Sequence, residues 1–167
     1  MNTGDKAAIR PVGPSDHDAI ATLVAAAFGR SDEAELVRRL RADGDASEEL
    51  VAVENEIVGH VFFSVLTVEP ATVRIAALAP VSVLPVRQNA GLGSMLIREG
   101  LGRCKALGFD AIAVLGDPGY YGRFGFTRRA ARTLRSIYAG PAYQALELRD
   151  GALVGGPWSV GYPRAFD

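Results

Sequence analysis

A glycine-containing turn between a predicted strand and a predicted helix is the feature of the sequence best suited to bind a charged ligand. The turn runs from Gln88 to Ser94 and contains Gly91 and Gly93, and an apolar run over residues 73–84 precedes it. The first N–H groups of a helix have no partner within the helix, and its dipole places partial positive charge there. Because glycines let a phosphate approach that backbone closely, the turn is a candidate anion site.

Three interpretations of this turn compete. In the first, the turn is purely structural, and Gly91 and Gly93 are there only because its backbone conformation needs glycine. In the second, the turn is a dinucleotide fingerprint, but Leu96 stands at the third glycine position and Asp110 begins the next strand where the motif needs an acidic residue at its end. A P-loop is excluded because the Gly-Lys-Ser/Thr sequence is missing. In the third, the turn holds the pyrophosphate of coenzyme A (CoA).

Two motifs in the right order resemble those of the GNAT superfamily of acetyl-CoA-dependent N-acetyltransferases. The first, Gln88-x-x-Gly91-x-Gly93, resembles the acyl-CoA loop of that family, written Gln/Arg-x-x-Gly-x-Gly/Ala. The second, from Tyr120 to Phe126, resembles a later Phe-Tyr-x-x-Leu-Gly-Phe segment. The resemblance covers roughly residues 7–130, and the tail is similar to that of a little-characterised bacterial branch.

The resemblance implies that the chain binds acetyl-CoA as co-substrate and moves its acetyl group onto a primary amine by direct attack on the thioester. It also implies that the strand over 73–84 splays from the strand over 110–115. Exposed backbone near Val81 and Val83 would then bind the pantetheine amides, and a backbone N–H there would polarise the thioester carbonyl. The pyrophosphate would lie on a loop of Gln88, Asn89, Ala90, Gly91, Leu92, Gly93 and Ser94.

Tyr121 matches the position of the family's general acid, which protonates the leaving thiolate. A free thiol has a pKa of about 8.5 and a tyrosine a pKa of about 10, so a positioned tyrosine can donate a proton at neutral pH. The alternative role for Tyr121 is packing against Phe124 or Phe126. Tyr120 is expected to lie in the core or to contact the cofactor arm.

The general base is left open by the sequence. The run over 75–84 contains no acidic residue, whereas some members of the family place a glutamate on this strand. His60, on the preceding predicted strand, has an ordinary pKa of about 6.5 that suits a base; a buried core histidine is the competing interpretation. Glu33 on the second predicted helix could line an acceptor cleft, and water alone is the third alternative.

Length and composition narrow the class of protein. The 167 residues fit one domain, expected to span residues 1–167. With 18 basic and 19 acidic residues and a net charge of −1, the chain is not expected to bind nucleic acid. The single Cys104 excludes an internal disulfide and a cysteine-based metal cluster, and no metal is expected. No apolar run reaches the ~18 residues of a membrane span, and residues 1–10 do not resemble a signal peptide, so we expect a cytoplasmic protein.

Hydrophobic periodicity predicts an α/β (α+β) fold. The order of the predicted elements gives a mixed sheet with helices on both faces. The resemblance implies a GNAT-like, mostly antiparallel central sheet of about six to seven strands, splayed between the fourth and fifth strands. The core motifs lie in 7–130, and residues 131–167 add C-terminal strands. The strands are predicted over 7–12, 49–54, 57–69, 73–84, 110–115, 143–148 and 158–162, and the longest helix over 91–108.

Two rival functions and two open questions remain. A non-catalytic acyl-CoA-binding regulatory domain is favoured by the missing strand glutamate and opposed by Tyr121. A Rossmann-type oxidoreductase is disfavoured by the absent third glycine. The acceptor is not specified; the arginines at 128, 129, 132 and 135 could contact the 3′-phosphate of CoA, an acidic substrate or solvent. Terminal strands exposing Trp158 and Tyr162 could pair across a homodimer.

Overall fold

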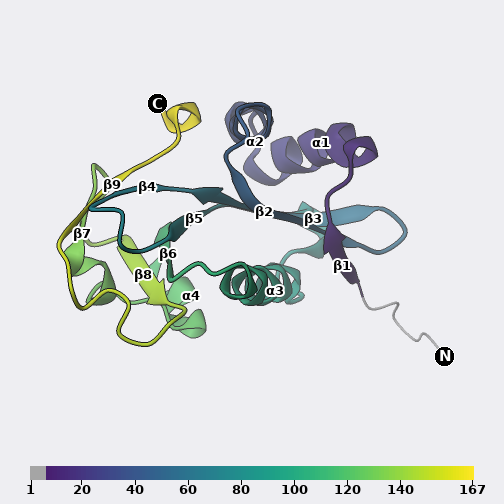
Figure 1. Cartoon of the computed structure of the whole chain (residues 1–167). Coiled ribbons are helices and arrows are strands. Elements are labelled where there is room, and N and C mark those ends of the chain that lie inside the picture. Colours follow the sequence, from purple (N-terminus) through teal and green to yellow (C-terminus); the bar gives the residue numbers. More distant parts are fainter. Residues whose placement is uncertain (1–6) are drawn as a thin grey trace.

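A six-stranded sheet forms the centre of the computed structural model, which describes residues 7–167 (Figure 1). Its strand order is β1-β2-β3-β5-β6-β8, in which β5 and β6 run parallel and the other neighbours antiparallel. The predicted mixed, mostly antiparallel sheet is therefore confirmed. Its strands are β1 (Ala8–Pro11), β2 (Ala46–Val53), β3 (Ile57–Val65), β5 (Ile75–Val83), β6 (Ala111–Leu115) and β8 (Tyr143–Glu147).

Helices cover both faces of this sheet, as predicted. α1 (His17–Phe28) and α2 (Asp32–Ala42) lie on one face, and α3 (Leu92–Ala106) lies on the other (Figure 1). α1 buries Ile20, Leu23 and Val24, whose three- and four-residue spacing places them on one side of a helix. Within residues 7–167, none of the helices combines the length and hydrophobicity that crossing a bilayer requires.

A second sheet of three strands contains the C-terminal part of the chain. Its order is β4 (Thr67–Glu69), β9 (Trp158–Gly161) and β7 (Leu134–Arg135). The prediction of one continuous strand over 57–69 was therefore wrong. The chain leaves the central sheet after Val65, the buried Leu66 joins the core of the second sheet, and Thr67 then pairs with Gly161 of β9. Alternating hydrophobicity is the same in both sheets, so the sequence pattern alone does not mark the change.

The predicted exposure of Trp158 was also wrong. Its side chain is only 4% exposed, and its indole Nε1–H donates to the Thr72 hydroxyl at 2.8 Å. β9 lies between β4 and β7, so both of its edges are paired within the chain. Tyr162 is half-buried, and its hydroxyl bonds that of Tyr143 at 3.0 Å. β9 is therefore the central strand of this second sheet and not one of its edge strands.

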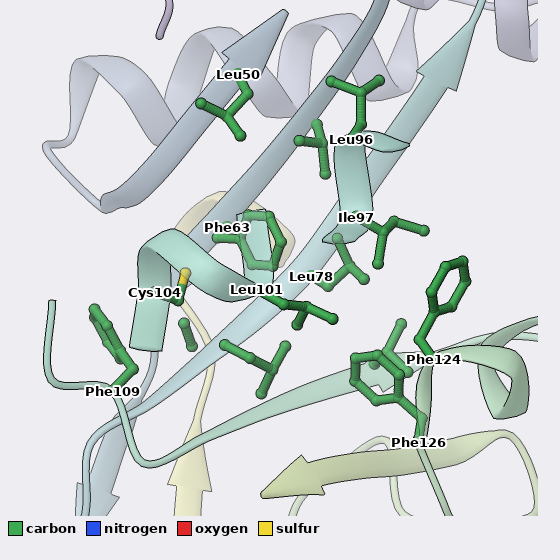
Figure 2. Packing of buried hydrophobic residues seen from close by; sticks show 14 of the residues in the cluster. Leu50, Phe63, Leu78, Leu96, Ile97, Leu101, Cys104, Phe109, Phe124 and Phe126 are labelled. Carbon is green, nitrogen blue, oxygen red and sulfur yellow. The ribbon is translucent and has the colours of Figure 1, made fainter. Parts of the chain in front are cut away.

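The largest apolar cluster fills the space between α3 and the central sheet. Phe63 of β3 points toward α3 between Leu101 and Leu96, and Phe124 and Phe126 approach from the side of Ile97 (Figure 2). Cys104 lies in the same cluster and is fully buried, as predicted. A Cβ built at Gly100 would lie 2.6 Å from Cζ of Phe63. Helix and sheet therefore approach closely because residue 100 has no side chain.

A matched pair of glycine substitutions in α3 tests this close approach. Gly100→Ala should lower the free energy of unfolding by about 1–3 kcal/mol, because the buried Phe63 ring must shift. Gly102→Ala should raise it by roughly 0.5–1 kcal/mol, because Gly102 is exposed, nothing lies near its Cβ position and alanine favours helix. Urea denaturation measures both, and equal effects of the two changes would contradict the packing described.

Candidate functional site

A gap opens in the central sheet between β5 and β6. The two strands pair only from Ile75 to Ala77 of β5 and from Ala111 to Ala113 of β6. Beyond that point β5 continues to Val83 while paired with β3 alone. The predicted splay between these two strands is therefore present, and it leaves one edge of β5 without a neighbouring strand.

The backbone of Val81 and Val83 faces this gap. Leu84 N–H donates to Val58 O at 2.9 Å across the β5–β3 pair. In an antiparallel pair, successive residues direct their N–H and C=O groups alternately toward and away from the partner. The N–H of Leu84 thus points toward β3, and the residues from Val83 back to Val81 pair with β3 one to one, without a bulge. The polar groups of Val81 and Val83 therefore point away from β3, where a ligand can reach them.

The turn after β5 presents unpaired N–H groups at the start of α3. Gly91 and Asn89 adopt left-handed backbone conformations, with φ of +86° and +63°. The first hydrogen bond of α3 runs from Met95 N–H to Gly91 O at 3.0 Å. The preceding N–H groups have no partner within the helix, and the helix dipole adds partial positive charge beside them. The N–H groups available to an anion are those of Leu92, Gly93 and Ser94.

Gly93 brings this helix start close to both β5 and Tyr120. A Cβ at position 93 would lie 3.0 Å from the Tyr120 hydroxyl oxygen and within 4 Å of the Val81 and Val83 side chains. A larger side chain at Gly93 would therefore project into the space between the helix start and the gap. This space is the place that a phosphate group on the helix start would need.

These features enclose one cavity of about 540 Å³. Tyr121 lines it, together with eight of the nine residues that the sequence predicted for the cofactor. The exception is Ala90, which is exposed and does not belong to the lining. The eight are Val81, Val83, Gln88, Asn89, Gly91, Leu92, Gly93 and Ser94.

A hydrogen bond from the Gln88 side chain connects the loop to the end of β5. The amide Nε2–H donates to the Val83 carbonyl at 3.1 Å. The sequence had placed Gln88 in the pyrophosphate loop, and the structure adds this contact to the strand. Loop and strand edge are therefore held together as one surface.

Two arginines in the lining, Arg87 and Arg123, were not predicted. Arg123 donates to the Ser94 hydroxyl at 3.1 Å and lies 4.7 Å from the centre of the Tyr120 ring. Arg87 forms an ion pair with Glu54, with Nε 2.7 Å from the carboxylate oxygen. Arg123 belongs to the second predicted motif and Arg87 directly precedes the first, so a cation beside a candidate anion site was the signal that could have found them.

Tyr121 stands at the end of α4 (Pro118–Tyr121), whose N-terminus is capped by the Asp117 carboxylate. The Tyr121 ring packs edge-on against Tyr120 and Phe126, with ring centres 5.0 and 5.9 Å away. This burial raises the pKa of Tyr121 to about 12. The hydroxyl therefore keeps its proton at neutral pH and can act as a proton donor.

Gly116, at the end of β6, makes room for the Tyr121 ring. A Cβ at Gly116 would lie 2.5 Å from Cε2 of Tyr121. The buried Gln144 holds Gly116 in place: its amide donates to Gly116 O at 3.1 Å and to Ala142 O at 3.2 Å. The position of Tyr121 thus depends on β6 and β8 as well as on its own helix.

Neither side chain proposed as a base lines the cavity. Glu33 of α2 pairs with Arg30, which precedes the helix, and lies beside residues 165–167. His60 is fully buried, and its Nε2 lies 2.7 Å from the Glu49 carboxylate, which also binds Arg41. Burial lowers the pKa of His60 more than the contact with Glu49 raises it. A neutral core histidine is therefore the role that the geometry supports.

Metal binding has no support in the part of the chain that the structure describes. Within residues 7–167, no three His, Cys, Asp or Glu side chains gather closely enough to hold a metal ion. The polar groups that line the cavity include two arginines, two tyrosine hydroxyls and the N–H groups at the start of α3.

Known proteins are similar to this chain both in sequence and in structure. A family model described as an acetyltransferase (GNAT) domain matches residues 8–129. An uncharacterised N-acetyltransferase of Escherichia coli strain K12, YhbS, is 36% identical over 163 residues, which cover 95% of this chain and 98% of YhbS.

Two solved structures extend this similarity to three dimensions. The crystal structure of Escherichia coli YhbS in complex with CoA superposes with a TM-score of 0.92 at 34% identity, covering 99% of this chain and 94% of that one. A GNAT family acetyltransferase from Brucella melitensis in complex with acetyl-CoA gives a TM-score of 0.81 at 35% identity, covering 96% and 98%.

The contact between Gly116 and Tyr121 makes a prediction about tyrosine ionisation. Gly116→Ala should displace the ring toward solvent, so the pKa of Tyr121 should fall from about 12 toward the ordinary value of about 10. Alkaline titration by NMR with isotope-labelled tyrosine, assigned with Tyr121→Phe, measures this. Gly122→Ala is the control, because nothing lies within 4 Å of its Cβ position. An unchanged pKa in Gly116→Ala would mean that the ring is held in some other way.

Proposed function

Because the chain belongs to the GNAT family of acetyltransferases, we propose that it transfers the acetyl group of acetyl-CoA to a primary amine by direct attack on the thioester. The observation that carries the proposal is the unpaired edge of β5 leading to the unpaired N–H groups of α3. CoA has a shape that matches this edge, because an amide-containing arm precedes its pyrophosphate.

The pyrophosphate would lie on the first turn of α3. There the N–H groups of Leu92, Gly93 and Ser94 supply donors, and Arg123 supplies a positive charge next to Ser94. Gly93 has no side chain that could cover these N–H groups, and the Tyr120 hydroxyl lies 3.0 Å from where its Cβ would be. The pantetheine amides would bond the outward-facing backbone groups of Val81 and Val83.

Acetyl-CoA supplies an activated thioester carbonyl for attack by the amine. A backbone N–H of β5 in the gap would donate to the carbonyl oxygen, which gains negative charge as the amine adds. Such a donor belongs to a paired strand, so it needs little reorganisation during the reaction. The sheet thus contributes both binding and stabilisation of the transition state.

Tyr121 would donate a proton to the sulfur as the C–S bond breaks. Its raised pKa of about 12 keeps it protonated, and it lines the same cavity as Val81 and Gly93. The proton lost by the amine would pass to water, since neither His60 nor Glu33 lines this cavity. The products are the acetylated amine and free CoA.

The helix start can be tested by placing a negative charge on it. Gly93→Glu should abolish acetyl-CoA binding in calorimetry, because the carboxylate would occupy the phosphate position and repel the phosphate. Gly102→Glu adds the same charge to an exposed site farther along α3, where nothing lies within 4 Å, and should bind normally. Unchanged affinity in Gly93→Glu, with the fold intact by circular dichroism, would reject the assigned site.

The acid role can be tested with the two adjacent tyrosines. Tyr121→Phe should lower turnover about 100-fold or more, the usual range for a general acid, with little change in acetyl-CoA affinity. Tyr120→Phe is the matched control and should keep most of the activity. The assay measures thiol release from acetyl-CoA with a panel of primary amines. Equal rates for Tyr121→Phe and the unmodified protein would reject Tyr121 as the acid.

A binding protein without turnover would behave differently in the same assay. It would bind acetyl-CoA tightly and release no thiol with any amine of the panel. That result would contradict the proposed transfer while leaving the binding site in place. Calorimetry and thiol release together therefore separate the two parts of the proposal.

A further inference from the structure

One segment of the chain is strongly basic although the whole protein is nearly neutral. Between Asp117 and Glu147 the sequence has five arginines and no Asp or Glu, against a net charge of −1 for all 167 residues. Arg123 belongs to the cavity described above. The other four follow within eight residues, around a short helical turn (Ala130–Thr133) and β7.

These four arginines keep their charges unpaired. None of them has a carboxylate within ion-pair distance anywhere in residues 7–167, whereas seven other arginines do. Their positive charge is therefore available to an external anion. The four are Arg128, Arg129, Arg132 and Arg135.

Two of the four, Arg128 and Arg132, line a cavity of about 430 Å³, which we call the arginine cavity. Tyr143 and the backbone of Gly140 belong to the same lining, and no acidic side chain does. Arg129 and Arg135 lie outside it. Guanidinium groups bind carboxylates and phosphates through paired, charge-assisted hydrogen bonds, so such a cavity suits an anion.

The arginine cavity opens on the opposite face of the sheet from the site for acetyl-CoA. Its lining residues Leu134 and Tyr143 pack into the cluster that also holds Trp158. Tyr120 and Tyr121 pack instead against the cluster under α3. Successive side chains of a strand point to opposite faces, and Gln144 accordingly reaches toward Gly116 on the side of Tyr121. The two cavities therefore approach the sheet from its two sides.

The arginine cavity also lies near the gap between β5 and β6. Tyr143 of β8 is paired with Leu115 at the end of β6, the strand that borders the gap. Neighbouring strands are about 4.8 Å apart, so the cavity begins roughly 10 Å from the gap. A small molecule can bridge that distance with an amine at one end and an anionic group at the other.

We propose that the arginine cavity binds a carboxylate or phosphate of the acceptor, so that the substrate carries both a primary amine and an anionic group. The inference rests on the proposed acetyl transfer and adds the chemical class of its acceptor. Arg128 and Arg132 fix the anionic end, and the amine extends through the gap to the thioester. Because the two cavities open on opposite faces, the arginines serve the acceptor and not the phosphates of CoA.

Matched amines test this class of acceptor. 8-Aminooctanoate is paired with octylamine and 6-aminohexyl phosphate with 6-aminohexanol, so that each pair differs in its anionic group and each anionic amine is long enough to span the roughly 10 Å between gap and cavity. The wild-type protein should acetylate at least one anionic amine with kcat/KM about 10-fold or more above its neutral partner. The pair with the larger preference shows whether the cavity binds a carboxylate or a phosphate. Equal kcat/KM within both pairs would overturn the proposal.

Variants that each remove one arginine charge, inside or outside the cavity, show which arginines bind the anionic group. Arg128→Gln and Arg132→Gln should each lower kcat/KM for the preferred anionic amine about 10- to 100-fold, the range for a lost charge-assisted hydrogen bond, and leave the neutral amine unaffected. Arg129→Gln and Arg135→Gln remove the same charge outside the cavity and should have little effect. If all four variants lose kcat/KM equally, the preference comes from general electrostatic attraction and not from binding in the cavity, and the proposal is overturned.

Two binding measurements separate this proposal from the others. The first is calorimetric titration with the anionic amines, which does not depend on turnover. If the wild-type protein binds them and Arg128→Gln does not, the arginine cavity is supported even when no thiol is released. If the wild-type protein does not bind them, the proposal is contradicted. Acetyl-CoA and its 3′-dephospho form are then titrated against Arg128→Gln. Weakened binding of acetyl-CoA alone would assign the arginines to the 3′-phosphate and overturn the proposal.

Discussion

Parallel pairing between β5 and β6 ends after three residues, and the site depends on this interruption. Beyond Ala77 the ladder with β3 continues alone to Val83, so one row of backbone donors and acceptors faces outward. Such groups need partners, and the amides of the proposed pantetheine arm would supply them. The same strand then delivers the chain to the start of α3, where further donors are free. The ligand site is thus a property of backbone more than of side chains.

This origin explains how much the sequence could predict. The Gln88–Ser94 turn, the helix after it and the order of the strands follow from local patterns, and eight of the nine predicted cofactor residues line the cavity. Contacts between distant segments were missed. Gln144 reaches Gly116, 28 positions away, and β4 pairs with β9 across more than 90 positions. Nothing in a local pattern encodes such pairings.

Tyr121, the proposed acid, shows how tertiary structure changes the properties of an aromatic residue. Its type and its spacing from Gly125 were visible in the sequence, but its pKa was not. That value comes from burial beside Tyr120 and Phe126 and from the absence of a side chain at Gly116. The two arginines beside α3 are a similar case, because their direction depends on Glu54 and Ser94.

The place of β9 at the centre of the second sheet has a consequence for biosynthesis. β4 is synthesised early and β7 later, yet both pair with β9, which begins at Trp158 and so is synthesised after both of them. During synthesis the chain emerges from its N-terminus onward. The second sheet therefore cannot form until residues 158–161 have left the ribosome, and until then neither β4 nor β7 has its partner strand.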